Sequence, residues 1–258
     1  MARAVRRPDA ETTQTPGTGD RSAVVSRFGH RQTQTLGPGS TRMQTLPTGI
    51  PTLDRRFGGG LPSGSVVALT ADPASQSELV LNRLARVRAC RYLTTVRSAA
   101  AVETAMGRGD ERSDTAASAD GGAETTVETA VGDSPDDVAE AAADLPERGT
   151  FVVDSVDPLE AAAAAPAYAA SLDELRAHVV EADGIALLHA LRGGEDARCR
   201  RVTEQVADVV FDLRTTVRGA EIVNRLVVPK FRGGAALEEP LKLKLTDAVS
   251  VDTSRDIA

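Results

Sequence analysis

The cysteines and histidines of this chain are the side chains that could bind a transition metal or form disulfides, but their spacing argues against both. Cys90 and Cys199 are far apart, and neither lies in a Cys-x-x-Cys pair. A zinc site and a disulfide framework are therefore not expected, and a reducing cytoplasm is the natural compartment for two separate thiols. His30 and His178 have no second His or Cys at ligand spacing, so we predict no metal site from them.

Three short motifs carry more information. The first consists of residues 48–54 (TGIPTLD) and 58–65 (GGGLPSGS), which lead into an apolar strand. The second is residues 151–155 (FVVDS), an apolar run that ends in an acid, and the third is residues 230–233 (KFRG). In this order the motifs resemble those of the RecA-like ATPases, specifically the KaiC/RadA-like branch. The resemblance covers about residues 46–252.

This resemblance implies a RecA-like three-layer α/β fold, with a mainly parallel central sheet and antiparallel C-terminal strands. It implies that Asp154, followed by Ser155, is the Walker B-like acid that holds Mg²⁺ in working members. His189 stands where such proteins place a polar switch residue that senses the γ-phosphate. Lys230 and Arg232 correspond to residues that reach a nucleotide on the neighbouring protomer. Each residue also has a structural interpretation, respectively a turn-capping acid, a buried histidine and exposed charges near a strand end.

The phosphate-binding loop is where the chain departs from this pattern. A working loop reads GxxxxGK[ST]: its backbone N–H groups cradle phosphate, its Lys reaches the β and γ oxygens, and its hydroxyl holds Mg²⁺. Here Ala71 and Gln76 stand where the glycines belong, and Ser77 replaces the Lys. Glu78 replaces the Ser or Thr, and with Asp72 it adds negative charge where a polyphosphate would lie. The complete segment is Ala71, Asp72, Pro73, Ala74, Ser75, Gln76, Ser77 and Glu78.

A second departure concerns the acid that activates water. Enzymes of this type carry a Glu after the second strand, where this chain has Val96, and Val cannot accept a proton. The sequence therefore predicts a catalytically impaired RecA/KaiC-like protein that acts as a regulatory or assembly partner. The partner would be a second copy or an active RadA/KaiC-like ATPase, in DNA recombination, repair or signalling. Binding of ATP and Mg²⁺ is expected to be weakened or lost.

Two other functions stay open. An ATP-binding NTPase with an unusual phosphate loop would need a cation from elsewhere, and Arg83 or a neighbour's Lys230 are the candidates. A DNA-binding accessory protein would use the Arg-rich first 42 residues or the basic region 192–201. Aromatic residues make up only 3% of the chain, which argues against a single-stranded nucleic-acid site built on stacking. The net charge of −11 that remains outside residues 1–42 opposes DNA binding in general.

The secondary structure that must position these residues is read from apolar periodicity. Residues 134–137 (SPDD) predict a helix start with Ser134 as N-cap. Continuous apolar runs predict buried parallel strands at residues 65–70, 92–96, 150–153, 185–190 and 208–213, with a further strand at 126–131. Helices are predicted at residues 53–57, 78–88, 99–106, 168–182 and 196–206. Residues 221–230 and 241–251 alternate like antiparallel strands.

Composition divides the chain into two parts. Residues 1–42 carry seven Arg against three acids and are predicted to be a disordered tail, or to precede the true start at Met43. Residues 43–258 would form the RecA-like core, with an acidic flexible insertion at about residues 107–125. Arg supplies 27 of the 30 basic residues, and acids exceed bases, which is typical of proteins from a salt-rich cytoplasm or of GC-rich codon usage. No apolar run is long enough to cross a membrane.

Overall fold

A mixed nine-stranded sheet forms the centre of the computed structural model, which describes residues 44–110, 124–130, 134–193, 197–234, 236–246 and 248–252. The strand order is β11-β10-β9-β8-β3-β7-β6-β4-β5. The six strands from β8 to β5 run parallel, and β9, β10 and β11 each pair antiparallel with their neighbours. The strands are β3 (Ser65–Ala71), β4 (Cys90–Thr94), β5 (Thr125–Thr129), β6 (Thr150–Asp154), β7 (Ile185–Leu191), β8 (Val209–Arg218), β9 (Glu221–Phe231), β10 (Leu241–Leu245) and β11 (Val249–Val251).

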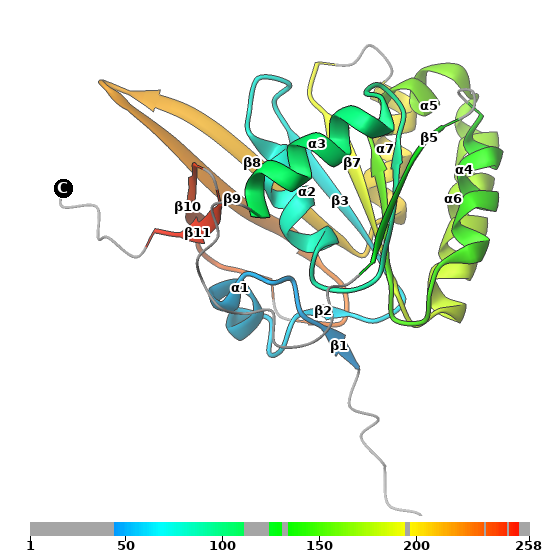
Figure 1. The fold of residues 1–258 in the computed structure, drawn as a ribbon, viewed down its shortest axis with the longest axis horizontal. Helices are drawn as coiled ribbons and strands as arrows, with labels where there is room; N and C mark the ends of the chain where they lie inside the picture. The colour runs from blue at the N-terminus through cyan, green and yellow to red at the C-terminus, as the bar shows by residue number, and fades with distance from the viewer. Residues whose placement is uncertain are drawn as a thin grey trace, which may run out of the picture. The chain divides into compact units, whose positions relative to one another are not determined.

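Helices cover both faces of this sheet, which gives the three layers that the sequence predicted (Figure 1). Alternate residues of β3 point to opposite faces, so Val67 and Leu69 pack with α2 and α3, whereas Val66 packs with α4, α6 and α7. The central strands are buried on both faces, which explains their unbroken apolar sequences. The helices are α1 (Pro51–Arg56), α2 (Ser77–Ala85), α3 (Ala99–Asp110), α4 (Pro135–Ala141), α5 (Asp157–Ala162), α6 (Ala165–Glu181) and α7 (Ala197–Val206), with a 3₁₀ turn at Ala142–Asp144.

The glycine-rich segment before β3 serves the fold. A short antiparallel pair, β1 (Thr45–Leu46) and β2 (Leu61–Pro62), brackets it. Gly60 has a φ of +133°, and a Cβ there would lie 2.1 Å from the carbonyl oxygen of Leu46. Thr48 donates from its backbone N–H and its hydroxyl to Asp54 Oδ1, at 2.7 and 2.6 Å. Much of this motif is therefore explained by a tight connection.

Three sequence-based predictions need correction. The strand predicted at residues 241–251 is two antiparallel strands, β10 and β11, and the Thr246 N–H donates to the carbonyl of Ala248 between them. Helix α3 continues through Gly107 to Asp110, so the predicted insertion does not begin at residue 107. Helix α4 does begin with Pro135, but the Ser134 side chain makes no capping hydrogen bond. The predicted tail, residues 1–42, and residues 111–123 of the predicted insertion lie outside the described part of the chain.

Candidate functional site

A chain of hydrogen bonds connects three buried polar side chains at the carboxyl end of the parallel strands. Ser77 Oγ lies 3.0 Å from His189 Nε2, and His189 Nδ1 lies 2.7 Å from Asp154 Oδ1. The three residues are 3%, 5% and 7% exposed, respectively. Because an ionised carboxylate can only accept, His189 Nδ1–H donates to Asp154. In the tautomer that carries its only ring proton on Nδ1, Nε2 accepts from the Ser77 hydroxyl.

The second oxygen of Asp154 is also occupied. The Tyr92 hydroxyl donates to Oδ2 at 2.8 Å, and Arg97 Nη2 donates to the same oxygen at 2.6 Å. Burial alone would raise the pKa of Asp154, but the hydrogen bonds from His189, Arg97 and Tyr92 outweigh it and lower the pKa to about 2. Burial, and then the neighbouring Asp154 charge, raise the pKa of Tyr92. Asp154 is therefore an ionised and fully partnered carboxylate.

Sheet register explains why these residues meet. Asp154 is the last residue of β6, and it lies directly opposite His189 of β7 on one side and Thr94 of β4 on the other. Ser77 is the first residue of α2, which follows β3 after a short loop. Sequence reasoning placed Asp154 and His189 at strand ends. Asp154 is the last residue of β6, as predicted, whereas β7 continues for two residues beyond His189.

Two members of this network were not identified from the sequence. Tyr92 lies inside the apolar strand β4, and Arg97 follows that strand in a bend. A usable signal was the polar hydroxyl of Tyr92 at an otherwise buried strand position, since such a group needs a partner. Val96, which the sequence pattern placed where working members carry the activating Glu, is 71% exposed.

The loop between β3 and α2 is a compact turn. The backbone N–H and the hydroxyl of Ser75 both donate to the carbonyl oxygen of Asp72, at 2.9 and 2.6 Å. The Asp72 carboxylate lies 3.4 Å from Arg192 Nη1 in the loop after β7. No residue from Ala71 to Glu78 has a positive φ, and Gln76 has φ −96° and ψ 40°. Pro73, Ala74 and Gln76 are exposed, whereas Ala71 and Ser77 are buried.

Ser155 continues the network through its backbone. Its N–H donates to Thr95 Oγ1 at 2.9 Å, and the Thr95 hydroxyl donates back to the Ser155 carbonyl at 2.7 Å. The Ser155 hydroxyl itself is buried without a hydrogen-bond partner in the structure. These contacts hold the loop after β4 against the loop after β6.

Lys230 and Arg232 lie away from this network, at the C-terminal end of α7. Lys230 Nζ donates to the carbonyl oxygens of Glu204 and Gln205, at 2.7 and 2.9 Å. Arg232 donates to the carbonyl of Gln205 at 3.0 Å and lies 3.4 Å from Asp208. Both cations therefore satisfy carbonyl groups that a helix end leaves unpaired. Burial and the neighbouring Arg232 lower the pKa of Lys230.

A serine, a histidine and an acid in this order also form the triad of many hydrolases. In such enzymes a substrate must reach the serine, whereas Ser77 is 3% exposed. Ser77, His189 and Asp154 do not line any of the four main surface hollows found among the described residues. The geometry therefore favours a structural connection over a nucleophilic site.

Mg²⁺ and a triphosphate, which this fold binds in working ATPases, do not fit the residues present. Both oxygens of Asp154 already accept hydrogen bonds, and Ser77, at the start of α2, is a buried serine that is bonded to His189. Among the described residues, no group of three or more His, Cys, Asp or Glu side chains could hold a metal ion. None of the described helices combines the length and apolarity that a membrane span requires.

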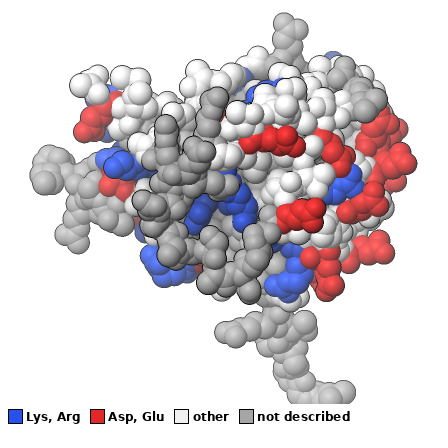
Figure 2. All heavy atoms as spheres, in the orientation of Figure 1, with Lys and Arg blue, Asp and Glu red and all other residues white. Residues whose placement is uncertain are grey.

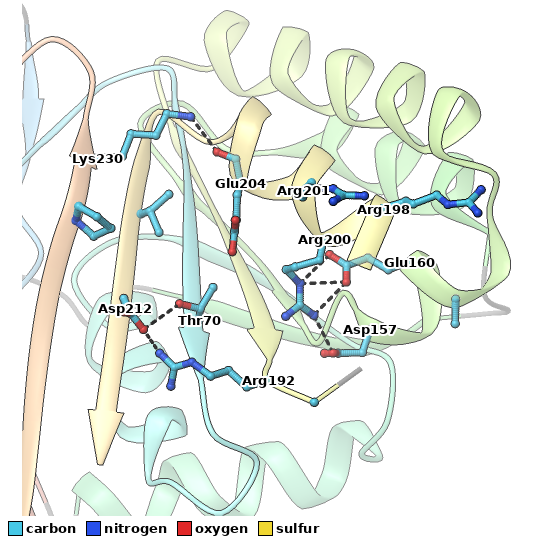
Figure 3. Close-up of a pocket in the computed structure, with 14 residues that line it drawn as sticks. Thr70, Asp157, Glu160, Arg192, Arg198, Arg200, Arg201, Glu204, Asp212 and Lys230 are labelled. Atoms are coloured by element: carbon cyan, nitrogen blue, oxygen red, sulfur yellow. Dashed lines mark hydrogen bonds and ion pairs between the residues drawn. The ribbon is translucent and has the colours of Figure 1, made fainter. Parts of the chain in front are cut away.

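A large open hollow lies on the other side of β3, between α7 and the β8–β9 strands (Figure 3). Its volume is about 1530 Å³. Arg200 is held there by Glu160 and Asp157, with nitrogen–oxygen distances of 2.8–3.1 Å. Burial raises the pKa of Glu160, and the neighbouring Arg200 guanidinium partly offsets this rise. The charged residues that line the hollow are Asp157, Glu160, Arg192, Arg198, Arg200, Arg201, Glu204, Asp212 and Lys230.

Comparison with known proteins identifies the fold and a family. A model described as a family of unknown function (DUF7125) matches residues 45–258. No curated protein matches the chain. Among solved structures, the chain is similar to the KaiC-like protein PH0186 from the hyperthermophilic archaeon Pyrococcus horikoshii OT3, with a TM-score of 0.63 and 15% sequence identity. That match covers 81% of this chain and 99% of the other, and at this identity it shows the α/β fold.

Proposed function

This chain belongs to the family of unknown function DUF7125 and has a KaiC-like fold, and we propose that it is a RecA-fold protein without ATPase activity. In this proposal the domain acts as a regulatory or assembly partner. The partner is a second copy or an active ATPase of the same fold, in DNA recombination, repair or signalling. The observation that carries the proposal is the buried hydrogen-bond chain from Ser77 through His189 to Asp154.

The hydrogen-bond chain supports the proposal because it occupies the Asp154 carboxylate, the group that would hold Mg²⁺ during ATP hydrolysis. A magnesium carboxylate must offer an oxygen to the ion or its waters, whereas Asp154 accepts from three donors. Releasing it would leave His189 and Tyr92 as buried donors without an acceptor, which costs about 1–3 kcal/mol for each group. ATP binding would have to supply this energy before any net affinity appeared.

The charge of the β3–α2 loop supports the same conclusion. Phosphate loops bind through a Lys and through backbone N–H groups that point at the phosphate. Here Asp72 and Glu78 flank a loop without Lys or Gly, and the backbone N–H of Ser75 is used within the turn. Arg192 does reach the loop, but it is also paired with Asp212.

The alternative of an NTPase with an unusual loop has less support. Arg83 Nε donates to the carbonyl oxygen of Gly49, at 2.6 Å, so its guanidinium is held at the segment before β3. Lys230 is occupied at the C-terminal end of α7 in its own chain. A role for Lys230 and Arg232 toward a neighbouring protomer's nucleotide would require them to leave these carbonyl groups.

Phosphate release from ATP by the purified full chain tests the proposal. We expect no turnover by the chain alone above the protein-free rate. When the chain is added to an active RecA-fold ATPase, we expect the turnover of that ATPase to change. Turnover by the chain alone that is abolished in Asp154→Ala, but kept in Asp72→Asn, would refute it.

A further inference from the structure

We infer that the open sheet face beside α7 is a binding surface for the phosphate backbone of double-stranded nucleic acid. We define this cationic face by the hollow between α7 and β8–β9 together with a row of basic residues on β8, β9 and β10. The inference is independent of the proposed function, because no residue of the Ser77–His189–Asp154 chain belongs to this face.

The basic row follows from strand register. Arg225 of β9 lies directly opposite Arg214 of β8 on one side and Lys242 of β10 on the other. Residues that face each other across strands share a face of the sheet, with Cβ atoms about 5 Å apart. Three cations therefore stand side by side across about 10 Å. Like charges at such positions destabilise a sheet, and here acids offset two of the three, Asp212 beside Arg214 and Asp252 beside Lys242.

The row and the hollow belong to one surface. Asp212 lines the hollow, and Arg214, two residues along β8, therefore shares its face and bonds Asp212 at 2.7 Å. Lys244, two residues from Lys242, extends the row and is exposed. Figure 1 shows the β8–β9 strands continuing past the helices, which leaves this part of the sheet uncovered by them.

Local pairing does not neutralise the cationic face. Arg192 is paired with Asp212, and Arg200 with Glu160 and Asp157. Two further acids lie on or beside this face: Glu204 lines the hollow, and Asp252 lies 3.2 Å from Lys242. The residues that line the hollow, together with the row and the contacting acids Asp72 and Asp252, comprise nine cations and six carboxylates on a chain whose net charge is −7: Arg192, Arg198, Arg200, Arg201, Arg214, Arg225, Lys230, Lys242 and Lys244 against Asp72, Asp157, Glu160, Glu204, Asp212 and Asp252.

The opposite edge of the sheet has the opposite charge. Glu128, Asp137, Glu140 and Asp144 surround the junction of β5 and α4. Figure 2 shows acidic side chains gathered over this side of the molecule. The two edges are separated by the width of the sheet, from β10 to β5. A polyanion is therefore attracted to one edge and repelled from the other.

The shape and composition favour a duplex backbone as the occupant. The cationic face is open and elongated, because β8 alone advances about 20 Å from Asp212 to Arg218. No aromatic residue lines the hollow or belongs to the row, so there is no platform on which unpaired bases could stack. Contacts would go to phosphates and would not depend on base sequence.

The test measures binding of the full chain to a labelled duplex of about 30 base pairs, by fluorescence anisotropy, between about 50 and 200 mM KCl. The variant is Arg201→Gln/Arg214→Gln, in which both side chains are exposed, and the matched control is Arg55→Gln/Arg56→Gln on α1. Both proteins lose two charges and keep residues 1–42, so the basic tail contributes equally. Urea unfolding of both variants checks that they are folded.

We expect the first variant to weaken binding roughly 10- to 100-fold at the lower salt concentration and to reduce the log–log salt slope by about 2. The control should remain within about twofold of the parent, since its charges lie elsewhere. Equal weakening by both variants would overturn the inference, as would the absence of binding by the parent. Tighter binding of poly-glutamate than of the duplex, under the same conditions, would also overturn it by identifying an acidic protein as the occupant.

Discussion

Substituting Asp154 with Asn tests whether this carboxylate is a structural acceptor. A pKa of about 2, where the ordinary value is 3.8, corresponds to about 2.5 kcal/mol of stabilisation at neutral pH. The Asn amide also turns an acceptor into a donor that faces Tyr92, Arg97 or His189, and a buried unpaired donor costs about 1–3 kcal/mol. We therefore expect Asp154→Asn to lower the free energy of unfolding by about 3–5 kcal/mol, as in other broken buried pairs.

The assay is urea unfolding at pH 7, followed by fits of the midpoint and slope, with Asp72→Asn as the matched control. Asp72 is partly exposed and has one longer contact, at 3.4 Å, so we expect its loss to cost less than about 1 kcal/mol. In an ATPase whose carboxylate waits for Mg²⁺, the same substitution would leave the ligand-free protein about as stable. Equal unfolding free energies for Asp154→Asn and Asp72→Asn would therefore refute the structural assignment.

The pH dependence gives a second readout of the same residue. Because the folded pKa of Asp154 lies below the unfolded value, its contribution is present above about pH 4 and is lost as the pH falls toward 2. The parent should lose about 2.5 kcal/mol more than Asp154→Asn over this interval. Parallel pH profiles for the two proteins would contradict the lowered pKa.

Two further substitutions test other parts of the fold. Gly60→Ala should destabilise the protein by at least about 2 kcal/mol, because a Cβ there meets the Leu46 carbonyl. The control Gly58→Ala, with φ +70° and open space around it, should cost only about 1 kcal/mol. Similar urea midpoints for the two variants would argue against the tight turn. Arg200→Ala leaves Glu160 buried without its cation and should cost about 3–5 kcal/mol, whereas Arg200→Ala/Glu160→Gln should recover part of that loss. Absence of any recovery in a thermal melt would show that the pair is not coupled.

The central layer of the molecule was predictable because its strands are buried on both faces and have unbroken apolar sequences. Residues 65–70 and 185–190 are examples, and both runs are strands, each extended by one residue. The C-terminal strands were harder to delimit, since alternation predicts a strand but does not mark the turn between β10 and β11. The predicted helix at residues 99–106 ended before Gly107, whereas α3 continues through Gly107 to Asp110.

The candidate site was only partly predictable. Strand ends identified Asp154 and His189, because neighbouring parallel strands bring such positions together. The contact between Ser77 and His189 joins residues 112 positions apart and depends on the angle at which α2 leaves the sheet, which no local pattern encodes. The role of Tyr92 and Arg97 depends on side-chain direction after β4 in the same way.

Calorimetric titration of ATP with Mg²⁺ into the full chain tests whether the domain binds nucleotide. We predict no saturable heat at protein concentrations suited to micromolar affinity, because the groups that would bind phosphate and Mg²⁺ are already bonded to one another. The Ser77→Lys variant, titrated alongside, should not gain binding, since the loop around it lacks both glycines. Saturable binding by the parent with a micromolar Kd, dependent on Mg²⁺ and lost in Asp154→Asn under conditions where that variant is folded, would show that Asp154 is a magnesium ligand and not a structural acceptor.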